Sequence, residues 1–496
     1  MSGEPVRPTF GGWVRPRSPG LGPLGLLSTM GVFAGLVVGL LTAMLAGAGP
    51  AAAVVVVAAV GVGLTVIPPG GQSVGTRAAV RLGWWRSRAG REHQYRGGLF
   101  GGDGTGGYPL PGALAGTVAL GCVDGYGNDC AVLFDRGSAL CAVVFRCRAD
   151  GPSLVDADTV NTWVANWGGA GLAGFGHEPG LVGVCVVVDT ARDPGSWLAA
   201  DIAGHADPAA PAVAAAVMAE VVASFPAASA ENTAYVAVSY TAAGGARRAG
   251  EVVTEIGRRV PGLVDVLRAA GGGTVEALGE TDLAELVRVA YDPGCALALA
   301  EAQLDPAGSG LVWEEAGPGA AQESWDSYRH DSGRSVTWTM TEAPHGLVHS
   351  DVLAGLLGPH PQFLRKRVAF CYRPHSPGRA STIAESDAQT AAFTATGTKG
   401  RVTAGAASRM RATKRAAAEV AEGAGMTRFA VLVTVTVTAD ADLKMAATTL
   451  ENLAAGARLR LRRAVGAQAA GFAATLPVGF LPWRHTFIPA AIRELL

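Results

Sequence analysis

Residues 18–76 read SPGLGPLGLLSTMGVFAGLVVGLLTAMLAGAGPAAAVVVVAAVGVGLTVIPPGGQSVGT, a stretch of 59 residues without Asp, Glu, Lys or Arg. So long an uncharged segment is typical of a chain that enters a lipid bilayer. Pro50 divides it into residues 24–46 and 51–67, and each part approaches the roughly 20 apolar residues that cross a hydrocarbon core. A signal peptide is the alternative for the first part, but its apolar region would be about 7–15 residues long and no second span would follow. The sequence therefore predicts a transmembrane helical hairpin over residues 24–67.

Arginines on both sides of the predicted hairpin indicate its orientation. Arg7, Arg15 and Arg17 precede the first span, six arginines between residues 77 and 96 follow the second, and the turn between the spans carries no charge. By the positive-inside rule both termini lie in the cytoplasm, and about 400 residues face the cytosol. The predicted location is the cytoplasmic (inner) membrane, as a multi-pass protein.

The segment after the second span mixes arginines with aromatic residues. Such side chains anchor a chain at a membrane interface, where anionic headgroups attract the positive charge. The predicted interface residues are Arg77, Arg81, Trp84, Trp85, Arg86 and Arg88. The alternative is a solvated basic linker.

Three glycines lie four residues apart in the first span, at Gly31, Gly35 and Gly39. This spacing places three positions without side chains on one helix face, so another backbone can approach closely. The sequence predicts helix packing on this face, by the second span or by another protein. The alternative is chance, because the chain contains 69 glycines.

Composition limits the remaining function classes. The formal net charge of -1 gives no basic excess for general nucleic-acid binding. The seven cysteines are odd in number and form no C-x-x-C, which indicates reduced core residues in a cytosolic domain. His345 and His349 lie four apart but lack the Glu that follows the first His in zinc proteases. We expect no metal site and no cofactor.

The composition along the chain predicts an α+β protein of five segments. They are a cytoplasmic N-terminal segment (1–23), two transmembrane helices (24–67), a basic juxtamembrane segment with a Gly-rich linker (68–112), and two plait-like α/β cytoplasmic units (113–304 and 320–496). A boundary rich in Pro and Gly lies between the units, at residues 305–319.

Hydrophobic periodicity predicts the elements of both units. The first contains strands 130–134, 139–147, 181–189 and 233–241 and helices 155–167, 208–223, 247–268 and 281–291, with Ser153 as a possible cap. The second contains strands 335–341, 367–372, 429–438 and 458–462 and helices within 388–423, 440–453 and 464–476, with Asp440 as a cap.

Several segments match catalytic motifs, but they lack the neighbouring secondary structure that those motifs require. GQSVG at residues 71–75 fits the nucleophile elbow G-x-S-x-G, but it follows a membrane span instead of a strand. The glycines 102, 104 and 107 lie in the linker, without the strand and helix of a dinucleotide site. Ser327, His330 and Asp331 are neighbours along the chain and predict a polar turn or helix cap, because triad members converge from separate elements. We expect no catalytic residue.

A phosphate-binding loop is also absent from the sequence. A Walker A motif ends in Gly-Lys-Ser/Thr, whereas the four lysines are followed by Arg367, Gly400, Arg415 and Met445. The chain is therefore not a P-loop ATPase.

Residues 429–479 resemble a domain that normally precedes such a motor. Their sequence, FAVLVTVTVTADADLKMAATTLENLAAGARLRLRRAVGAQAAGFAATLPVG, is similar to the end of the N-terminal domain of the assembly ATPases of type IV secretion and conjugation machines. Gln468, Phe472, Leu476 and Pro477 match that family's final helix, while Val478 separates Pro477 from the expected glycine. The resemblance implies partner docking by these four residues. The alternative is that Phe472 and Leu476 are buried against the predicted strands 429–438 and 458–462.

The whole chain resembles an uncharacterised membrane-protein family of GC-rich Gram-positive bacteria. WVANWG at 163–168, DTARDPGS at 189–196 and residues 325–333 carry this likeness. The hairpin is similar to the small two-span subunit that accompanies these ATPases. Together these resemblances imply a fusion of that subunit with a motorless ATPase domain.

The predicted function is a membrane-anchored, non-catalytic scaffold of a type IV secretion-like conjugative transfer machine. Its expected partners are a separate secretion or conjugation ATPase, other inner-membrane subunits and an anionic membrane surface, with a possible homo-oligomer and no direct nucleic-acid binding. A membrane component of a type VII secretion system and a membrane-surface enzyme are the alternatives. The enzyme alternative predicts a pocket in which titratable side chains converge.

Overall fold

The computed structural model describes residues 10, 11, 13, 26–65, 74–98, 107–149, 151, 155–193, 195–228, 230–242, 249–344, 346–396 and 404–485. The described residues form two compact units. The sheet unit lies within His93–Ser386 and Lys414–His485, together with residues 10 and 11. The helical unit lies within Trp13–Glu92 and Asp387–Thr413.

The helical unit begins with α1 (Leu26–Ala46), α2 (Ala48–Thr65) and α3 (Val74–Ala89). Gly47, with φ of +87°, separates α1 from α2, a conformation that glycine adopts readily at helix ends. Pro50 lies in the first turn of α2, where its missing N–H costs no helix hydrogen bond. α2 contacts both α1 and α3.

One described helix is long and apolar enough to cross a membrane. It is α1, over Thr29–Ala46. The apolar part of α2, Ala48–Gly63, is shorter. The structure thus supports one membrane-crossing candidate near the N-terminus by length and composition.

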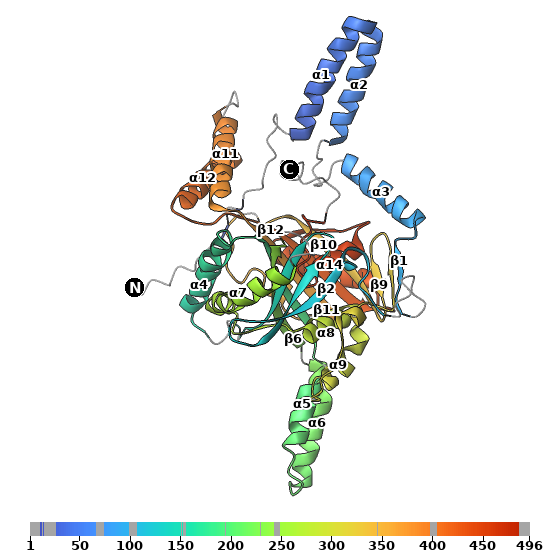
Figure 1. Ribbon diagram of the computed structural model, residues 1–496, viewed down its shortest axis with the longest axis vertical. Coiled ribbons are helices and arrows are strands. Elements are labelled where there is room, and N and C mark those ends of the chain that lie inside the picture. Colours follow the sequence, from blue (N-terminus) through green and yellow to red (C-terminus); the bar gives the residue numbers. More distant parts are fainter. Residues whose placement is uncertain are drawn as a thin grey trace. The chain divides into compact units, whose positions relative to one another are not determined.

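The sheet unit contains one large antiparallel sheet of 13 strands (Figure 1). The strands are β1 (Gln94–Arg96), β2 (Thr117–Val123), β3 (Asp129–Asp135), β4 (Leu140–Arg148), β5 (Leu181–Arg192), β6 (Ala230–Thr241), β7 (Thr274–Ala277), β8 (Ala320–Glu323), β9 (Tyr328–His330), β10 (Gly333–Glu342), β11 (Arg365–Pro374), β12 (Thr427–Thr438) and β13 (Arg460–Arg463). Their order is β1-β8-β9-β10-β12-β11-β5-β6-β4-β3-β2, with β13 on β10 and β7 on β4. The fold is therefore mixed α/β, as the sequence predicts.

Eleven helices connect these strands or follow them along the described chain. They are α4 (Ala157–Asn166), α5 (Ser196–Gly204), α6 (Ala212–Ala228), α7 (Ala249–Ala269), α8 (Glu280–Tyr291), α9 (Ala296–Ala302), α10 (Ala354–Leu357), α11 (Pro377–Thr396), α12 (Ala404–Ala421), α13 (Leu443–Gly456) and α14 (Gln468–Ala474). A π-helical turn (Trp167–Ala173) follows α4, and 3₁₀ turns lie at Gly112–Leu114, Pro293–Cys295 and Trp313–Glu315.

The sheet repeats one topology. The first half, strands β2–β7, is ordered β2-β3-β4-β6-β5 with β7 on β4, and the second half, strands β8–β13, is ordered β8-β9-β10-β12-β11 with β13 on β10. The connecting helices correspond as well: α4 with α10, α5–α6 with α11–α12, α7 with α13, and α8 with α14. The halves join where β5 pairs antiparallel with β11, with Cys185 opposite Cys371. This arrangement relates the halves by an approximate two-fold axis at the join.

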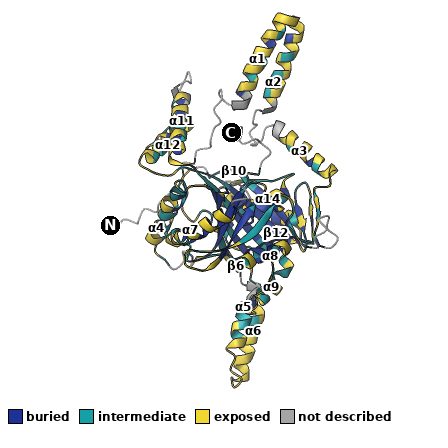
Figure 2. Ribbon diagram, viewed as in Figure 1, coloured by how far each residue is buried: buried dark blue, intermediate teal, exposed yellow. Residues whose placement is uncertain are grey.

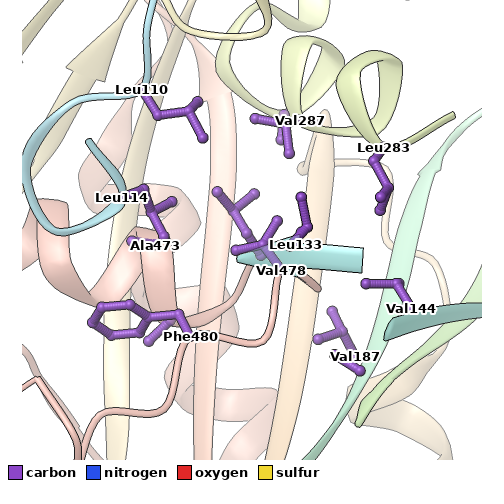
Figure 3. Close-up of a cluster of buried hydrophobic side chains, with 14 of the residues drawn as sticks. Leu110, Leu114, Leu133, Val144, Val187, Leu283, Val287, Ala473, Val478 and Phe480 are labelled. Atoms are coloured by element: carbon purple, nitrogen blue, oxygen red, sulfur yellow. The ribbon is translucent and has the colours of Figure 1, made fainter. Parts of the chain in front are cut away.

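Alternating side chains of the strands build cores on both faces of the sheet. Val143 and Phe145 of β4 face α7, and Val336 and Trp338 of β10 face α13. Val144 points to the opposite face, where α8 and α14 cover one continuous core across the join (Figures 2 and 3). This shared core is why both halves belong to one compact unit, although the sequence suggests two units with a boundary at 305–319.

The predicted long elements are present, with shifted ends. The helix expected within 388–423 is two helices, α11 and α12. The cap of α13 is Asp442, not Asp440, because the Asp442 side chain accepts from the backbone N–H groups of Lys444 and Met445. Ser153, suggested as a cap, lies outside the described residues. The sequence missed β1, β2, β7, β8 and β9, which are short or lack alternation.

Candidate functional sites

The predicted docking residues lie in the core of the sheet unit. Gln468, Phe472, Leu476 and Pro477 are all buried, and Phe472 has no exposed surface. α14 lays this stripe against β10 and β12, because its apolar face completes the core that α8 covers in the first half. This burial agrees with the core alternative and not with a docking surface on this stripe.

A buried polar layer lies between α14 and the sheet. The Gln468 side-chain amide accepts from the backbone N–H of Thr337 at 2.8 Å and donates to the Ala464 carbonyl at 3.0 Å. Thr434 Oγ1 lies 2.7 Å from Thr337 Oγ1 and 2.8 Å from Thr475 Oγ1. Because these four side chains all have hydrogen-bond partners inside the protein, they fix the position of α14.

His330 extends this layer but cannot act on an external substrate while it is buried. Its Nδ1 lies 2.5 Å from the Tyr291 carbonyl and its Nε2 lies 2.7 Å from Ser335 Oγ. A carbonyl only accepts, so Nδ1 carries the proton and Nε2 accepts from the serine hydroxyl. Burial lowers the pKa of His330 to about 4, and the neutral ring is fully enclosed.

The residues Ser327, His330 and Asp331 do not form a catalytic triad. Ser327 accepts from Arg334, and Asp331 accepts from the backbone N–H groups of Gly319 and Ala320. Asp331 sits in the turn between β9 and β10 with φ of +36°. The predicted polar turn is present at Asp331, whereas Ser327 is buried just before β9 and His330 is buried at its end.

Arg367 is the least satisfied group in this layer. It is 1% exposed, and its three guanidinium nitrogens have no hydrogen-bond partner among the described residues. Its guanidinium carbon lies 4.4 Å from the centre of the Phe472 ring, which provides a cation–π contact. Burial lowers the pKa of Arg367 to about 10. A buried cation without hydrogen bonds opposes folding.

The segment after α14 crosses to the first half of the sheet. Phe480 and Leu481 are buried, and His485 Nε2 lies 2.9 Å from the Asp135 carboxylate. Burial on its own would raise the pKa of Asp135, but hydrogen bonds from His485, Ser138 and Gly137 lower it to about 2. Residues 480–485 thus pack within the chain, and residues 486–496 lie outside the described residues.

A cavity of about 830 Å³ opens beside α8 and α9. Leu286, Val289 and Leu299 form one wall, and the strands contribute Tyr235 and several arginines to the other. Its other lining residues are Arg146, Arg148, Ala191, Arg192, Asp193, Glu231, Thr281, Asp282, Glu285, Pro293, Ala296, Ala300, Gln303, Gly308, Leu364 and Arg365.

Two arginines of this cavity are held by carboxylates. Arg146 donates to Glu276 at 2.9 Å and to Asp282 at 3.0 Å, and Arg365 Nε donates to the Asp189 carboxylate at 2.9 Å. Burial raises the pKa of Tyr235 to about 12, so this phenol stays protonated at neutral pH. The arrangement offers ion pairs and an apolar wall, and its lining includes no nucleophile hydrogen-bonded to a base.

Metal-binding groups of three or more His, Cys, Asp or Glu are absent from the part of the chain that the structure describes. His345 and the elbow-like residues 71–75 fall mainly outside that part, as do glycines 102 and 104. All seven cysteines are free thiols, and five of them are buried.

The glycine face of α1 lies against α2. A Cβ added at Gly35 would lie 2.4 Å from Ala58 Cβ, and one at Gly39 would lie 2.9 Å from a Val55 methyl. Gly31 is looser, with Val62 at 3.7 Å. The close approach of the two helices therefore requires glycine at position 35 and favours it at 39.

The predicted interface residues lie on α3, but its two tryptophans differ. Trp85 is 74% exposed, while Trp84 is 8% exposed. Leu82 shares the exposed side with Trp85, and the arginines Arg77, Arg81, Arg86 and Arg88 are all exposed. Helical spacing places Leu82 and Trp85 on one stripe with arginines on both flanks. Of the two tryptophans, only Trp85 is free to meet a membrane surface in this arrangement.

Comparison with known families concerns the N-terminal region. The model of a family described as "Domain of unknown function (DUF8461)" matches residues 17–76. The match covers the uncharged stretch that contains α1 and α2, and the description assigns no activity. The search of curated proteins finds no match.

Proposed function

We propose that this protein is a membrane-anchored, non-catalytic scaffold of a type IV secretion-like transfer machine, where it holds a separate ATPase at the membrane. The observation that carries the proposal is that one chain contains a helix apolar enough to cross a membrane and a duplicated sheet unit in which buried or charged side chains are engaged by the chain itself. His330 is enclosed, and Arg146 and Arg365 are held by carboxylates. The context of a transfer machine comes from the resemblance of residues 429–479 to ATPase N-terminal domains.

In this proposal α1 and α2 both cross the membrane. α2 has 18 residues, which is about the lower limit for a span, and its packing on the glycine face of α1 supports insertion as a pair. The arginines on both sides of the pair place both termini in the cytoplasm. The protein is then a multi-pass component of the inner membrane that contacts other inner-membrane subunits.

α3 lies on the anionic surface of the same membrane in this proposal. Eight residues separate it from the described end of α2, so the chain holds it near the headgroups. Leu82 and Trp85 enter the interface, and the flanking arginines meet lipid phosphates. Attraction of polybasic segments to anionic lipid is worth about 1 kcal/mol for each Arg near the surface.

Each half of the sheet unit is, in our proposal, a plait extended by two strands. The order β7-β4-β6-β5 in the first half and β13-β10-β12-β11 in the second is the order of a βαββαβ plait, and the helices fall between the required strands. A plait presents edges and helix faces for protein contacts, and a tandem pair suits a scaffold. The docking surface for the ATPase then lies on exposed residues and not on the buried stripe of α14.

Co-expression with the transfer ATPase encoded in the same organism tests this function. With the full-length chain, the ATPase should appear in the membrane fraction, and deletion of residues 24–67 should return it to the soluble fraction. The purified chain alone should not hydrolyse ATP, because it has no Gly-Lys-Ser/Thr. An ATPase whose distribution ignores the chain, or ATP turnover by the chain itself, would refute the proposal.

A further inference from the structure

α6 is an apolar helix whose surface lies open in this structure. Its sequence AVAAAVMAEVVASFPAA has one charged residue, Glu220, yet Val213, Val217 and Val221 are 76%, 52% and 39% exposed. These valines are four residues apart and form one stripe along the helix. α6 packs on α5, which in turn contacts α9 of the sheet unit (Figure 2). A helix this apolar is normally covered, and a contiguous exposed patch marks an interaction site.

α12, at the equivalent position in the second half, has the opposite charge. Residues 196–228, which include α5 and α6, contain Asp201, Asp207 and Glu220 and neither Lys nor Arg. α12 contains Arg409, Arg411, Lys414 and Arg415 with one acid, Glu419. The net charge is -1 for α6 alone, -3 for the whole segment 196–228, and +3 for α12.

The exposed face of α12 combines this charge with small side chains. Ala404, Ser408, Arg411, Arg415 and Ala418 are all exposed and lie on one face at helical spacing. Small residues allow another helix to approach closely, and their basic neighbours can reach acids on its rim. This face complements the valine stripe and Glu220 of α6 in both size and charge.

The two helical pairs leave the sheet at opposite ends. β5 runs into α5 after Arg192, close to the start of β11, where Arg365 pairs with Ala191. β11 runs toward α11 after Pro374, near the start of β5, where Tyr372 pairs with Val184. The 12 residues of β5 span about 40 Å. The connections that carry α6 and α12 therefore begin at opposite ends of the β5–β11 pair. A contact between α6 of one copy of the protein and α12 of another is then head to tail.

We propose that α6 of one copy packs against α12 of a second copy, so that the protein assembles head to tail. Such a heterologous contact generates a closed ring or an open filament. The valine stripe becomes buried, and Glu220 meets the Arg411 and Arg415 face. A symmetric contact between two α6 helices would instead bring their acids together and leave the basic face of α12 unused. The assembly does not depend on the identity of the ATPase partner.

Charge reversal in the full-length protein, in detergent, tests this contact. Association is measured by analytical ultracentrifugation over a concentration series. Glu220→Arg should weaken association roughly tenfold, and so should the double variant Arg411→Glu/Arg415→Glu, because each replaces attraction by repulsion. Combining all three substitutions should restore association. Val217→Asn should also weaken it, whereas the control Tyr126→Ser, at a 77% exposed aromatic side chain on the β2–β3 turn, should not.

Higher salt should weaken the wild-type association as well, because the charges lie on exposed faces. Three results would overturn the proposal. The first is a wild-type chain that stays monomeric at every concentration. The second is tighter association of Glu220→Arg, which would indicate a symmetric α6–α6 contact. The third is protection of α6 by lipid vesicles with unchanged association, which would assign the stripe to a membrane surface.

Discussion

Phe472→Ala is expected to be among the most destabilising single substitutions in the sheet unit. The Phe472 ring is fully buried, and its centre lies 5.0 Å from that of Tyr291, 5.4 Å from that of Tyr328 and 4.7 Å from that of His330. Removing a buried Phe side chain costs about 3–5 kcal/mol. The loss of the contact with the desolvated Arg367 adds up to about 2 kcal/mol.

We therefore expect the free energy of unfolding to fall by about 5 kcal/mol. That is a large part of the roughly 5–15 kcal/mol available to a folded domain. Denaturant unfolding of the full-length protein in detergent, followed by tryptophan fluorescence, measures the change by linear extrapolation. Phe472→Leu should cost less, roughly 1–2 kcal/mol, because it refills most of the volume but supplies no aromatic ring.

Phe393→Ala is the matched control, because Phe393 of α11 is 78% exposed. It should change the free energy of unfolding by no more than about 0.5 kcal/mol. A cost below about 1 kcal/mol for Phe472→Ala would refute the core assignment. An unchanged free energy of unfolding together with lost ATPase recruitment would instead indicate that Phe472 belongs to a docking surface.

Three further substitutions test other parts of the structure. Arg367→Met should raise the free energy of unfolding by about 1 kcal/mol in the same assay. The lowered pKa of about 10 reflects a burial cost of about 3 kcal/mol, which exceeds the stabilisation lost with the cation–π contact. A lower free energy of unfolding would refute this. The pKa of His330 is lowered to about 4 from 6.5, so the unfolded chain binds more protons than the folded chain between these pH values. The free energy of unfolding should therefore be highest above pH 6.5 and fall by up to about 3 kcal/mol toward pH 4. His330→Gln should flatten this pH profile, and an unchanged profile would contradict the burial argument. Gly35→Leu should separate α1 from α2 and abolish a disulfide crosslink engineered between the two helices. The control Gly61→Leu should leave the crosslink intact, because an added Cβ there meets nothing within 4 Å. An unaffected crosslink in Gly35→Leu would show that the glycine face is not the contact.

Local patterns in the sequence were sufficient for most of the elements. The uncharged stretch 18–76 predicted α1 and α2, because helix formation and lipid solubility depend on consecutive residues. The alternation at 429–438 predicted β12, and the amphipathic run at 247–268 predicted α7. Short strands such as β1 and β7 were not predicted, because a strand of three or four residues has too few positions to show a period.

The sites depended on contacts between distant residues. Phe472 has the same helical spacing whether its stripe faces solvent or a sheet, and only the packing of α14 under β10 and β12 placed it in the core. Trp84 and Trp85 are neighbours in the sequence, but one rotation step of about 100° along α3 makes one buried and the other exposed.

The sequence by itself determined the N-terminal helix that is apolar enough to cross a membrane, the mixed α/β class, and the absence of a phosphate-binding loop, because each follows from residue types at short spacing along the chain. Tertiary structure alone decided that the two expected units share one sheet through β5 and β11, since the pairing of Cys185 with Cys371 joins residues 186 positions apart. It also decided which charges are paired. Arg365 has Asp189, while Arg367, two residues further on the same strand face, has the Phe472 ring close to its guanidinium and no hydrogen-bond partner among the described residues. The local sequence determines which face of a strand a side chain lies on, but the fold determines which residue it contacts there.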